Sequence, residues 1–285
     1  MGLKIKVNFD LKFQNYGTLI DMKSMSLNTR LVVGTIILLC AVTLVAVIRS
    51  KQHNSLAMDP NGGNVTISAE YAGSQVVVDN LVLLSTATDK EYLTFDKLTA
   101  YPHQFAVTKE GYWPWVKTLT PALHTSTSLQ SFSVLINPTR EDVASSSNAF
   151  LTFKKQFKSL AVPSSKTVLQ SKDGNMAIWA NQNQIFAEWI GDSTKVPYYF
   201  CKQGICNSRI IVVTSRYNIR SLDFLPENSE VIVFANDTSI NAIELNRDDV
   251  QNFQPIYQTA MPQFILDSEH GMTVDSEDSI FRLSF

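Results

Sequence analysis

A run of eighteen uncharged, mostly aliphatic residues is the feature that most constrains this chain. It extends from Leu31 to Ile48, reads LVVGTIILLCAVTLVAVI, and is closed by Arg30 and Arg49. As an α-helix it would be about 27 Å long, close to the roughly 30 Å thickness of a bilayer's hydrocarbon core. A buried core helix of this length would normally show a polar face, so the run predicts a transmembrane helix.

A cleaved signal peptide is the alternative to an anchor, because Ser55-Leu56-Ala57 offers small residues where a signal peptidase reads them. The apolar run is longer than the usual stretch of about 7 to 15 residues, however, and Arg49 and Lys51 separate it from that sequence. An uncleaved anchor is therefore favoured. Five Lys or Arg precede the run and two follow closely, so the positive-inside rule predicts a cytoplasmic tail at 1–30, a span at 31–48 and export of the remainder.

The charge balance argues against nucleic acid as a partner. The chain has 24 Lys+Arg and 26 Asp+Glu, a formal net charge of -2. Seven of the basic residues lie within residues 1–51, so the exported part is acidic overall. A nucleic-acid-binding surface would need a surplus of basic charge.

The three cysteines are consistent with export. Cys40 lies in the apolar run, where a thiol behaves as a small hydrophobe. Cys201 and Cys206 enclose Lys-Gln-Gly-Ile between the strand-like sequences VPYYF and RIIVV, so a hairpin turn at Gly204 would bring their sulfurs together. A zinc site would need further ligands, but the four histidines are scattered, and a redox pair would want two intervening residues. We expect a structural disulfide in an oxidising compartment, with no metal and no cofactor.

Residues 64–137 have the pattern of a small antiparallel β-sandwich. Segments that alternate or are β-branched are separated by turn residues such as those of Ala72-Gly73-Ser74. The expected strands are Val65–Tyr71, Gln75–Asp79, Tyr92–Leu98, Gln104–Lys109 and Trp115–Thr120. Residues 49–63 end in Pro60-Asn61-Gly62-Gly63 and predict a flexible linker between the span and this sandwich.

Three motifs in this stretch point to a known module. The first strand opens with V-x-I-S at Val65, and the second ends in Val78-Asp79. The closing segment from His103 to Tyr112 follows the pattern G-x-h-x-v-x-v-x-k-x-G-Y from its h position onward. The run from Gly63 to Pro121 thereby resembles the PEGA domain, a small β-module of bacterial and archaeal surface proteins. The resemblance implies a surface-exposed role and implies no enzymatic activity.

Residues 138–162 predict one amphipathic connecting helix. Apolar residues recur there at helical spacing: Phe150, Phe153, Phe157 and Leu160. Thr139, followed by Asp142, offers an N-cap. We expect the apolar stripe to dock on a neighbouring sheet, and the alternative is a helix lying on the membrane with its lysines at the surface.

Residues 163–285 return to a strand pattern. Strands are expected at Thr167–Gln170, Met176–Ala180, Gln184–Ile190, Arg209–Val213, Ile219–Leu225, Glu230–Ala235, Ser239–Leu245, Phe264–Leu266, Gly271–Val274 and Ser279–Leu283. Three stretches repeat a strand, a turn and a second strand, and their turns at Asp173, Asn228 and Glu269 are 55 and 41 residues apart. Propeller blades repeat at about 40 to 50 residues, so a propeller-like antiparallel β-domain of about three blades is predicted. Closed propellers have at least about four blades, so this fold would be open or covered at one edge.

The chain as a whole resembles single-pass PEGA-domain membrane proteins of bacteria in its order of anchor, sandwich and blade-like tail. No enzyme motif is present: G-x-S-x-G, H-E-x-x-H, the phosphate-binding loop and the dinucleotide fingerprint are all missing. We therefore expect no catalytic residues. The acidic residues of the last twenty positions match no calcium loop and predict a solvated turn.

Tyr112 and Trp113 are the candidate ligand-binding residues. Together with Trp115 they form an aromatic cluster on a loop, where amphipathic rings can stack on sugars or proteins. The alternative is a role within the fold, and Trp115 is the expected core residue. We expect a non-catalytic scaffold or binding protein, anchored in the cell membrane, whose extracytoplasmic part recognises an envelope protein or polysaccharide. An accessory subunit of a membrane complex and, less favoured, an envelope hydrolase are the alternatives.

Overall fold

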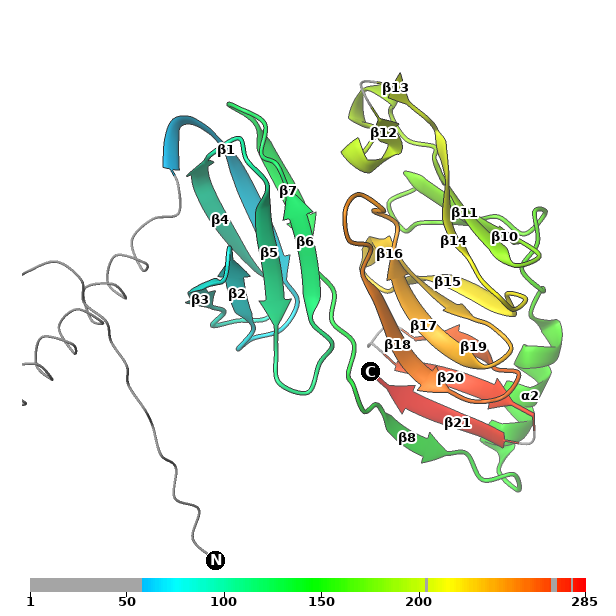
Figure 1. Cartoon of the computed structure of the whole chain (residues 1–285). Coiled ribbons are helices and arrows are strands. Elements are labelled where there is room, and N and C mark those ends of the chain that lie inside the picture. Colours follow the sequence, from blue (N-terminus) through cyan, green and yellow to red (C-terminus); the bar gives the residue numbers. More distant parts are fainter. Residues whose placement is uncertain (1–57, 203–204, 268–270, 278) are drawn as a thin grey trace, which may run out of the picture. The chain divides into compact units, whose positions relative to one another are not determined.

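The computed structural model describes residues 58–202, 205–267, 271–277 and 279–285. This part is mainly β-structure, with one α-helix and two short 3-10 turns at Ser193–Lys195 and Tyr198–Phe200 (Figure 1). The predicted mainly β class is therefore confirmed. None of the helices in the described part is long and apolar enough to cross a membrane, and the predicted span at 31–48 lies outside the described residues.

The first β region (residues 58–137) contains two sheets, with strand orders β4-β1-β7 and β3-β2-β5-β6. Its strands are β1 Met58–Ala69, β2 Gln75–Val78, β3 Leu81–Ser85, β4 Glu91–Leu98, β5 His103–Thr108, β6 Trp115–Leu119 and β7 Ser126–Gln130. Alternate positions along β1 and β5, such as Val65, Ile67 and Phe105, are fully buried, as expected where one face of a sheet packs on the core. All five predicted strands are present, but the region is not wholly antiparallel, because β7 pairs parallel to β1.

The predicted linker is shorter than expected, because its residues 58–63 belong to β1. A Cβ on Gly62 would collide with the carbonyl oxygen of Leu98, and one on Gly63 would collide with that of Ala122. The two glycines therefore permit close approach of the backbone, which is one of the uses of glycine in strands.

The predicted helix over 138–162 is wrong at its first half. Thr139–Asp142 is strand β8, and helix α2 covers Asn148–Ser159. Its N-cap is Ser147, whose hydroxyl accepts a hydrogen bond from the backbone N–H of Phe150 at 3.1 Å, so neither Thr139 nor Asp142 caps it. A local S/T-x-x-D pattern cannot reveal that β8 has a strand partner at the other end of the chain.

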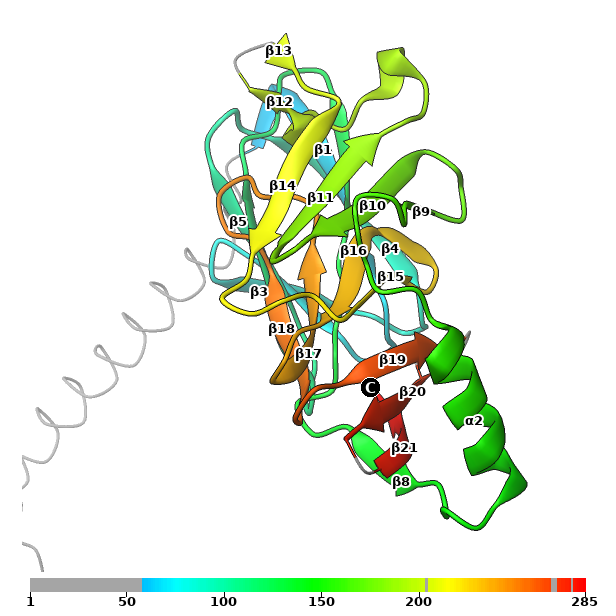
Figure 2. The same cartoon turned by 90° about the vertical axis from the view of Figure 1, so that its right-hand side faces the viewer.

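The apolar stripe of α2 docks on a sheet, as predicted. Phe157 is buried, and Phe150 and Phe153 are half-buried. The guanidinium of Arg282 lies 5.7 Å from the ring centroid of Phe153, and Lys154 pairs with Asp275 at 3.3 Å. Both partners belong to the last sheet of the chain, beside which α2 lies (Figure 2).

The second β region (residues 138–285) contains three four-stranded antiparallel sheets, with orders β14-β11-β10-β9, β15-β16-β17-β18 and β19-β20-β21-β8. Their bounds are β9 Leu169–Gln170, β10 Met176–Asn181, β11 Gln184–Trp189, β14 Arg209–Thr214, β15 Ser221–Leu225, β16 Asn228–Ala235, β17 Ser239–Glu244, β18 Phe253–Gln258, β19 Gln263–Leu266, β20 Gly271–Ser276 and β21 Ser279–Ser284. In the third sheet β8 pairs with β21, so segments from both ends of the region meet.

Strand β18, Phe253–Gln258, was not predicted, and it carries Pro255 in its interior. Proline cannot donate to a ladder and is tolerated in sheets at edges or bulges. Strand β18 is an edge strand, and its register against β17 shifts beside Pro255.

The two β regions share one hydrophobic cluster. It includes Phe105, Phe132 and Val134 from the first region and Leu225 and Phe281 from the second. A second cluster lies within the first two sheets of the second region, around Ile178 and Ile232. Residues 56–285 accordingly form one compact unit.

Candidate functional site

The two predicted ligand-binding residues lie next to each other but have different surroundings. The ring of Tyr112 lies 4.7 Å from that of Tyr71, and the ammonium of Lys109 lies 4.8 and 5.1 Å from the centroids of Tyr71 and Tyr112. Trp113 is half-buried against the shared cluster, and its indole N–H donates to the carbonyl of Pro255 at 3.1 Å. Trp115 is 2% exposed, so its prediction as a core residue is confirmed. Ligand binding by Tyr112 and Trp113 stays a prediction.

The predicted disulfide is present. Strands β12 (Cys201–Lys202) and β13 (Ile205–Cys206) pair antiparallel, and the sulfurs of Cys201 and Cys206 are 2.05 Å apart. The predicted pivot at Gly204 lies outside the described residues. A link that closes so short a loop contributes only about 2 kcal/mol on the chain-entropy model. Its main effect is on the local geometry of the hairpin.

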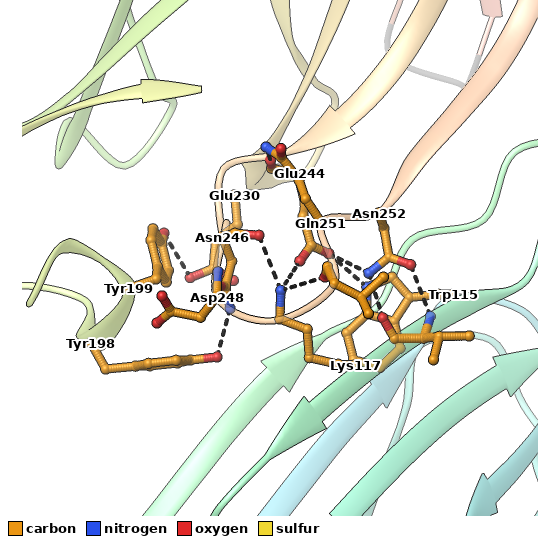
Figure 3. Close-up of polar contacts among 12 residues, drawn as sticks. Trp115, Lys117, Tyr198, Tyr199, Glu230, Glu244, Asn246, Asp248, Gln251 and Asn252 are labelled. Carbon is orange, nitrogen blue, oxygen red and sulfur yellow. Dashed lines mark hydrogen bonds and ion pairs between the residues drawn. The ribbon is translucent and has the colours of Figure 1, made fainter. Parts of the chain in front are cut away.

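A buried polar network connects the two β regions (Figure 3). At its centre Lys117 of β6 is 1% exposed, and its ammonium forms an ion pair with the carboxylate of Glu244 on β17. The same ammonium donates to the carbonyl oxygens of Asn246 at 3.0 Å and Val250 at 3.1 Å. All three donors of the ammonium are therefore used.

The carboxylate of Glu244 has partners on both sides. It accepts hydrogen bonds from the indole N–H of Trp115 at 3.0 Å and from the side-chain amide of Asn252 at 2.7 Å. Asn252 also pairs with the backbone of Val116, whose N–H donates to it and whose carbonyl accepts from it, both at 2.8 Å. Burial raises the pKa of Glu244, while the charge of Lys117 and these hydrogen bonds lower it.

A second carboxyl group lies beside this ion pair. Glu230 accepts a hydrogen bond from the hydroxyl of Tyr199 at 3.2 Å, and burial raises its pKa. The cavity between Glu230, Glu244 and Trp115 is only about 20 Å³, room for about one water molecule. A network with no space for a substrate fixes how the two β regions meet, and we assign it that structural role.

A row of neighbouring pockets follows sheet edges in the described part of the chain. It consists of three pockets of about 530, 200 and 440 Å³, in which the first and second share Asp223 and the second and third share Pro163. We call these three pockets the edge groove. Its middle pocket is lined by Leu169 of β9, Leu222 of β15 and Phe264 of β19. Each of these strands is the edge strand of a different sheet.

The segment after α2 forms one wall of the edge groove. Leu160 and Pro163 line the middle pocket, and Val162 lines the third. This segment passes from α2 towards β9, alongside β15 (Figure 2). The groove is therefore bounded by three strands and a connection.

Charged groups lie at both ends of the edge groove. The first pocket contains Asp173, Asp223 and Glu227, and Lys172 pairs with Glu227 at 2.8 Å. The third pocket contains Arg220, whose guanidinium lies 3.6 Å from the carboxylate of Asp237. Among the described residues, no group of three or more His, Cys, Asp or Glu could hold a metal ion. The arrangement is suited to non-covalent binding.

The sequence contains only a weak signal for this site. The run Asp223-Phe224-Leu225-Pro226 lines the first pocket, but nothing in the sequence around it indicates that it lines a groove. No protein-family model and no curated protein sequence matches this chain. The geometry of the groove is therefore the basis for assigning a function.

Proposed function

We propose that this protein is a single-pass membrane protein whose β-rich part lies outside the cytoplasm and binds an envelope protein, without catalysis, in the edge groove. The observation that carries the proposal is the meeting of three edge strands, β9, β15 and β19, at one pocket. An exposed sheet edge binds an extended polypeptide by adding it as a further strand. Pockets of about 200 to 530 Å³ are also of the size that holds ligand side chains.

The architecture that best fits this groove is an open propeller. In this interpretation the three four-stranded sheets are blades, and β9, β15 and β19 are the first strands of the three runs of strands that follow α2. Strand β8, from before α2, completes the third blade. With three blades instead of the minimum of about four, the first strands would face a gap that a partner could fill. The first β region would be a PEGA-like module.

The proposed location rests on two properties of the chain. The apolar run Leu31–Ile48 with its flanking charges predicts export of the residues after it, and the Cys201–Cys206 disulfide is typical of oxidising compartments. The two properties are independent, because one depends on hydropathy and charge and the other on thiol chemistry.

Site-specific photocrosslinking in intact cells tests the proposal. We would place a photoreactive amino acid in the full chain at Gln170 in the first pocket or Asn218 in the third, with Gln104 on the exposed face of β5 as control. We expect both groove positions to capture the same envelope protein and the control position not to capture it.

Two outcomes would refute protein binding in the groove. One is that the groove positions capture nothing beyond what Gln104 captures. The other is that the captured material is sensitive to glycosidase and not to protease, which would identify a polysaccharide as the ligand of the groove.

A further inference from the structure

Asp223 lies at the junction of two pockets of the edge groove. It is on edge strand β15 and lines both the first and the middle pocket. Its carboxylate accepts a hydrogen bond from the backbone N–H of Phe224 at 2.8 Å, and none of the ion pairs among the described residues includes it. Although its side chain reaches solvent, the surrounding protein raises its pKa through burial. The carboxylate of Asp223 therefore forms no ion pair with another described residue.

Two further carboxylates, those of Asp173 and Glu227, line the first pocket. The carboxylate of Asp173 accepts hydrogen bonds from the hydroxyl of Ser171 and from the side-chain amide of Asn175. Against the effect of burial, these hydrogen bonds lower its pKa. The ammonium of Lys172 is the one cation that lines this pocket, and it pairs with Glu227. Three carboxylates therefore face one ammonium, and the pocket is complementary to a cationic group.

The other end of the groove offers a donor. Arg220 precedes Asp223 by three residues, so along an extended chain the two lie about 10 Å apart. The Nε of Arg220 has no hydrogen-bond partner in the described part of the chain but is enclosed by protein atoms, so a ligand could reach this guanidinium only through the 28% of the side chain that is exposed. The third pocket is also lined by three amide side chains, by the carboxylate of Asp237 and by apolar residues: Gln182, Asn218, Gln263, Val162, Pro163, Ile219 and Met261. Arginine and amide donors are suited to the carbonyl oxygens of a peptide backbone.

Between the two ends the groove is apolar. Leu169, Leu222 and Phe264 line the middle pocket, and each comes from a different edge strand. A small free cation would use only the first pocket, and a neutral polysaccharide could donate hydroxyl hydrogen bonds to Asp223 but would supply no positive charge. An extended polypeptide fits all three parts, because it has a backbone for the edges, apolar side chains for the middle and a charged side chain for one end.

We infer that the edge groove takes an extended polypeptide segment that places a Lys or Arg side chain on Asp223 and its backbone carbonyl groups towards Arg220. This inference rests on the proposed function, and it adds the chemistry of the partner segment. It concerns binding alone and requires no bond to be made or broken.

The inference can be tested with peptide pools and the full chain in detergent micelles. The peptides are blocked at both ends and have about nine residues, which is long enough to reach from Asp223 to Arg220. Three pools differ only in the central residue, which is Lys, Met or Glu, and the flanking positions are randomised over Val, Thr and Ser. We expect the Lys pool to be retained about tenfold more than the Glu pool. Asp223→Asn should reduce retention of the Lys pool about tenfold, towards that of the Met pool.

The control variant is Asp96→Asn, which changes an exposed carboxylate on β4 and should leave retention unchanged. Equal retention of the Lys and Glu pools would overturn the inference, and so would equal effects of the two substitutions. Binding of N-acetyl-lysine amide as tight as that of the Lys pool would also overturn it, because a lone cation would then suffice. If crosslinking from the groove captures a protein while the pools show no preference for Lys, the inference fails and the proposed function stands.

Discussion

Lys117 and Glu244 are 127 positions apart in the chain and form a buried ion pair whose side chains are 1% and 7% exposed. Lys117→Met would leave the carboxylate of Glu244 buried without its cation. Breaking a buried pair in this way costs about 3 to 5 kcal/mol, so we expect the free energy of unfolding to fall by about 3 kcal/mol or more. Urea denaturation of the full chain in detergent measures this change.

Lys172 is the matched control at the same scale, because its ion pair with Glu227 is 81% and 51% exposed. Lys172→Met should change the free energy of unfolding by less than about 1 kcal/mol. Similar losses for the two lysine variants would contradict the structural role that we assign to the buried network. The double variant Lys117→Met/Glu244→Gln should recover part of the loss, because it removes the uncompensated charge.

Glu70 gives the protein a predictable dependence on pH. Burial raises the pKa of Glu70 from 4.5 to about 7, although the backbone N–H of Ser133 and the charge of Lys90 lower it. Between these two values the folded chain binds more protons than the unfolded chain, so the free energy of unfolding falls as the pH rises from 4.5 to about 7. Glu70→Gln should remove about 2 to 3 kcal/mol of this fall. Urea denaturation at a series of pH values measures this change in the free energy of unfolding. The control is Glu110→Gln, which changes an exposed carboxylate. If the free energy of unfolding depends on pH in the same way in both variants, the pKa of Glu70 is not raised.

At the scale of elements, α2 depends on a single capping hydroxyl. The hydroxyl oxygen of Ser147 accepts a hydrogen bond from the backbone N–H of Phe150 at 3.1 Å. Ser147→Ala leaves this donor without its partner, and we expect a loss of about 1 kcal/mol in the free energy of unfolding. The neighbouring exposed Ser146 is the control, and Ser146→Ala should have no measurable effect in the same urea denaturation. Loss of stability in Thr139→Ala but not in Ser147→Ala would instead support the longer helix that the sequence predicts.

At the scale of the whole molecule, the state of the two paired cysteines reports where the β-rich part is located. We expect Cys201 and Cys206 to resist alkylation when intact cells are treated with a membrane-permeant reagent, because a disulfide in an oxidising compartment has no free thiol. Mass spectrometry of the proteolytic fragments reads the result. Samples reduced before alkylation are the control and should be modified at both residues. Alkylation without prior reduction would place this part of the chain in a reducing compartment.

Local sequence patterns were sufficient to predict the mainly β class of the fold and most of its strands. Strands such as Met176–Asn181 and Ser239–Glu244 were predictable because alternation and β-branching act within a few residues. The Cys201–Cys206 link and the burial of Trp115 were predictable for the same local reason. Which strands pair, as β1 with β7 and β8 with β21, was decided by contacts between distant segments.

The positions of the groove and of the buried network depend on how distant segments pack together. Nothing near Asp223 in the sequence shows that β9 and β19 come to the same pocket, and nothing near Lys117 shows that Glu244 will be its partner. The physical reason is that a charge or a sheet edge acquires its role from the groups around it. Hydrophobic patterning selects which faces are buried, but packing of the sheets against one another selects which side chains meet.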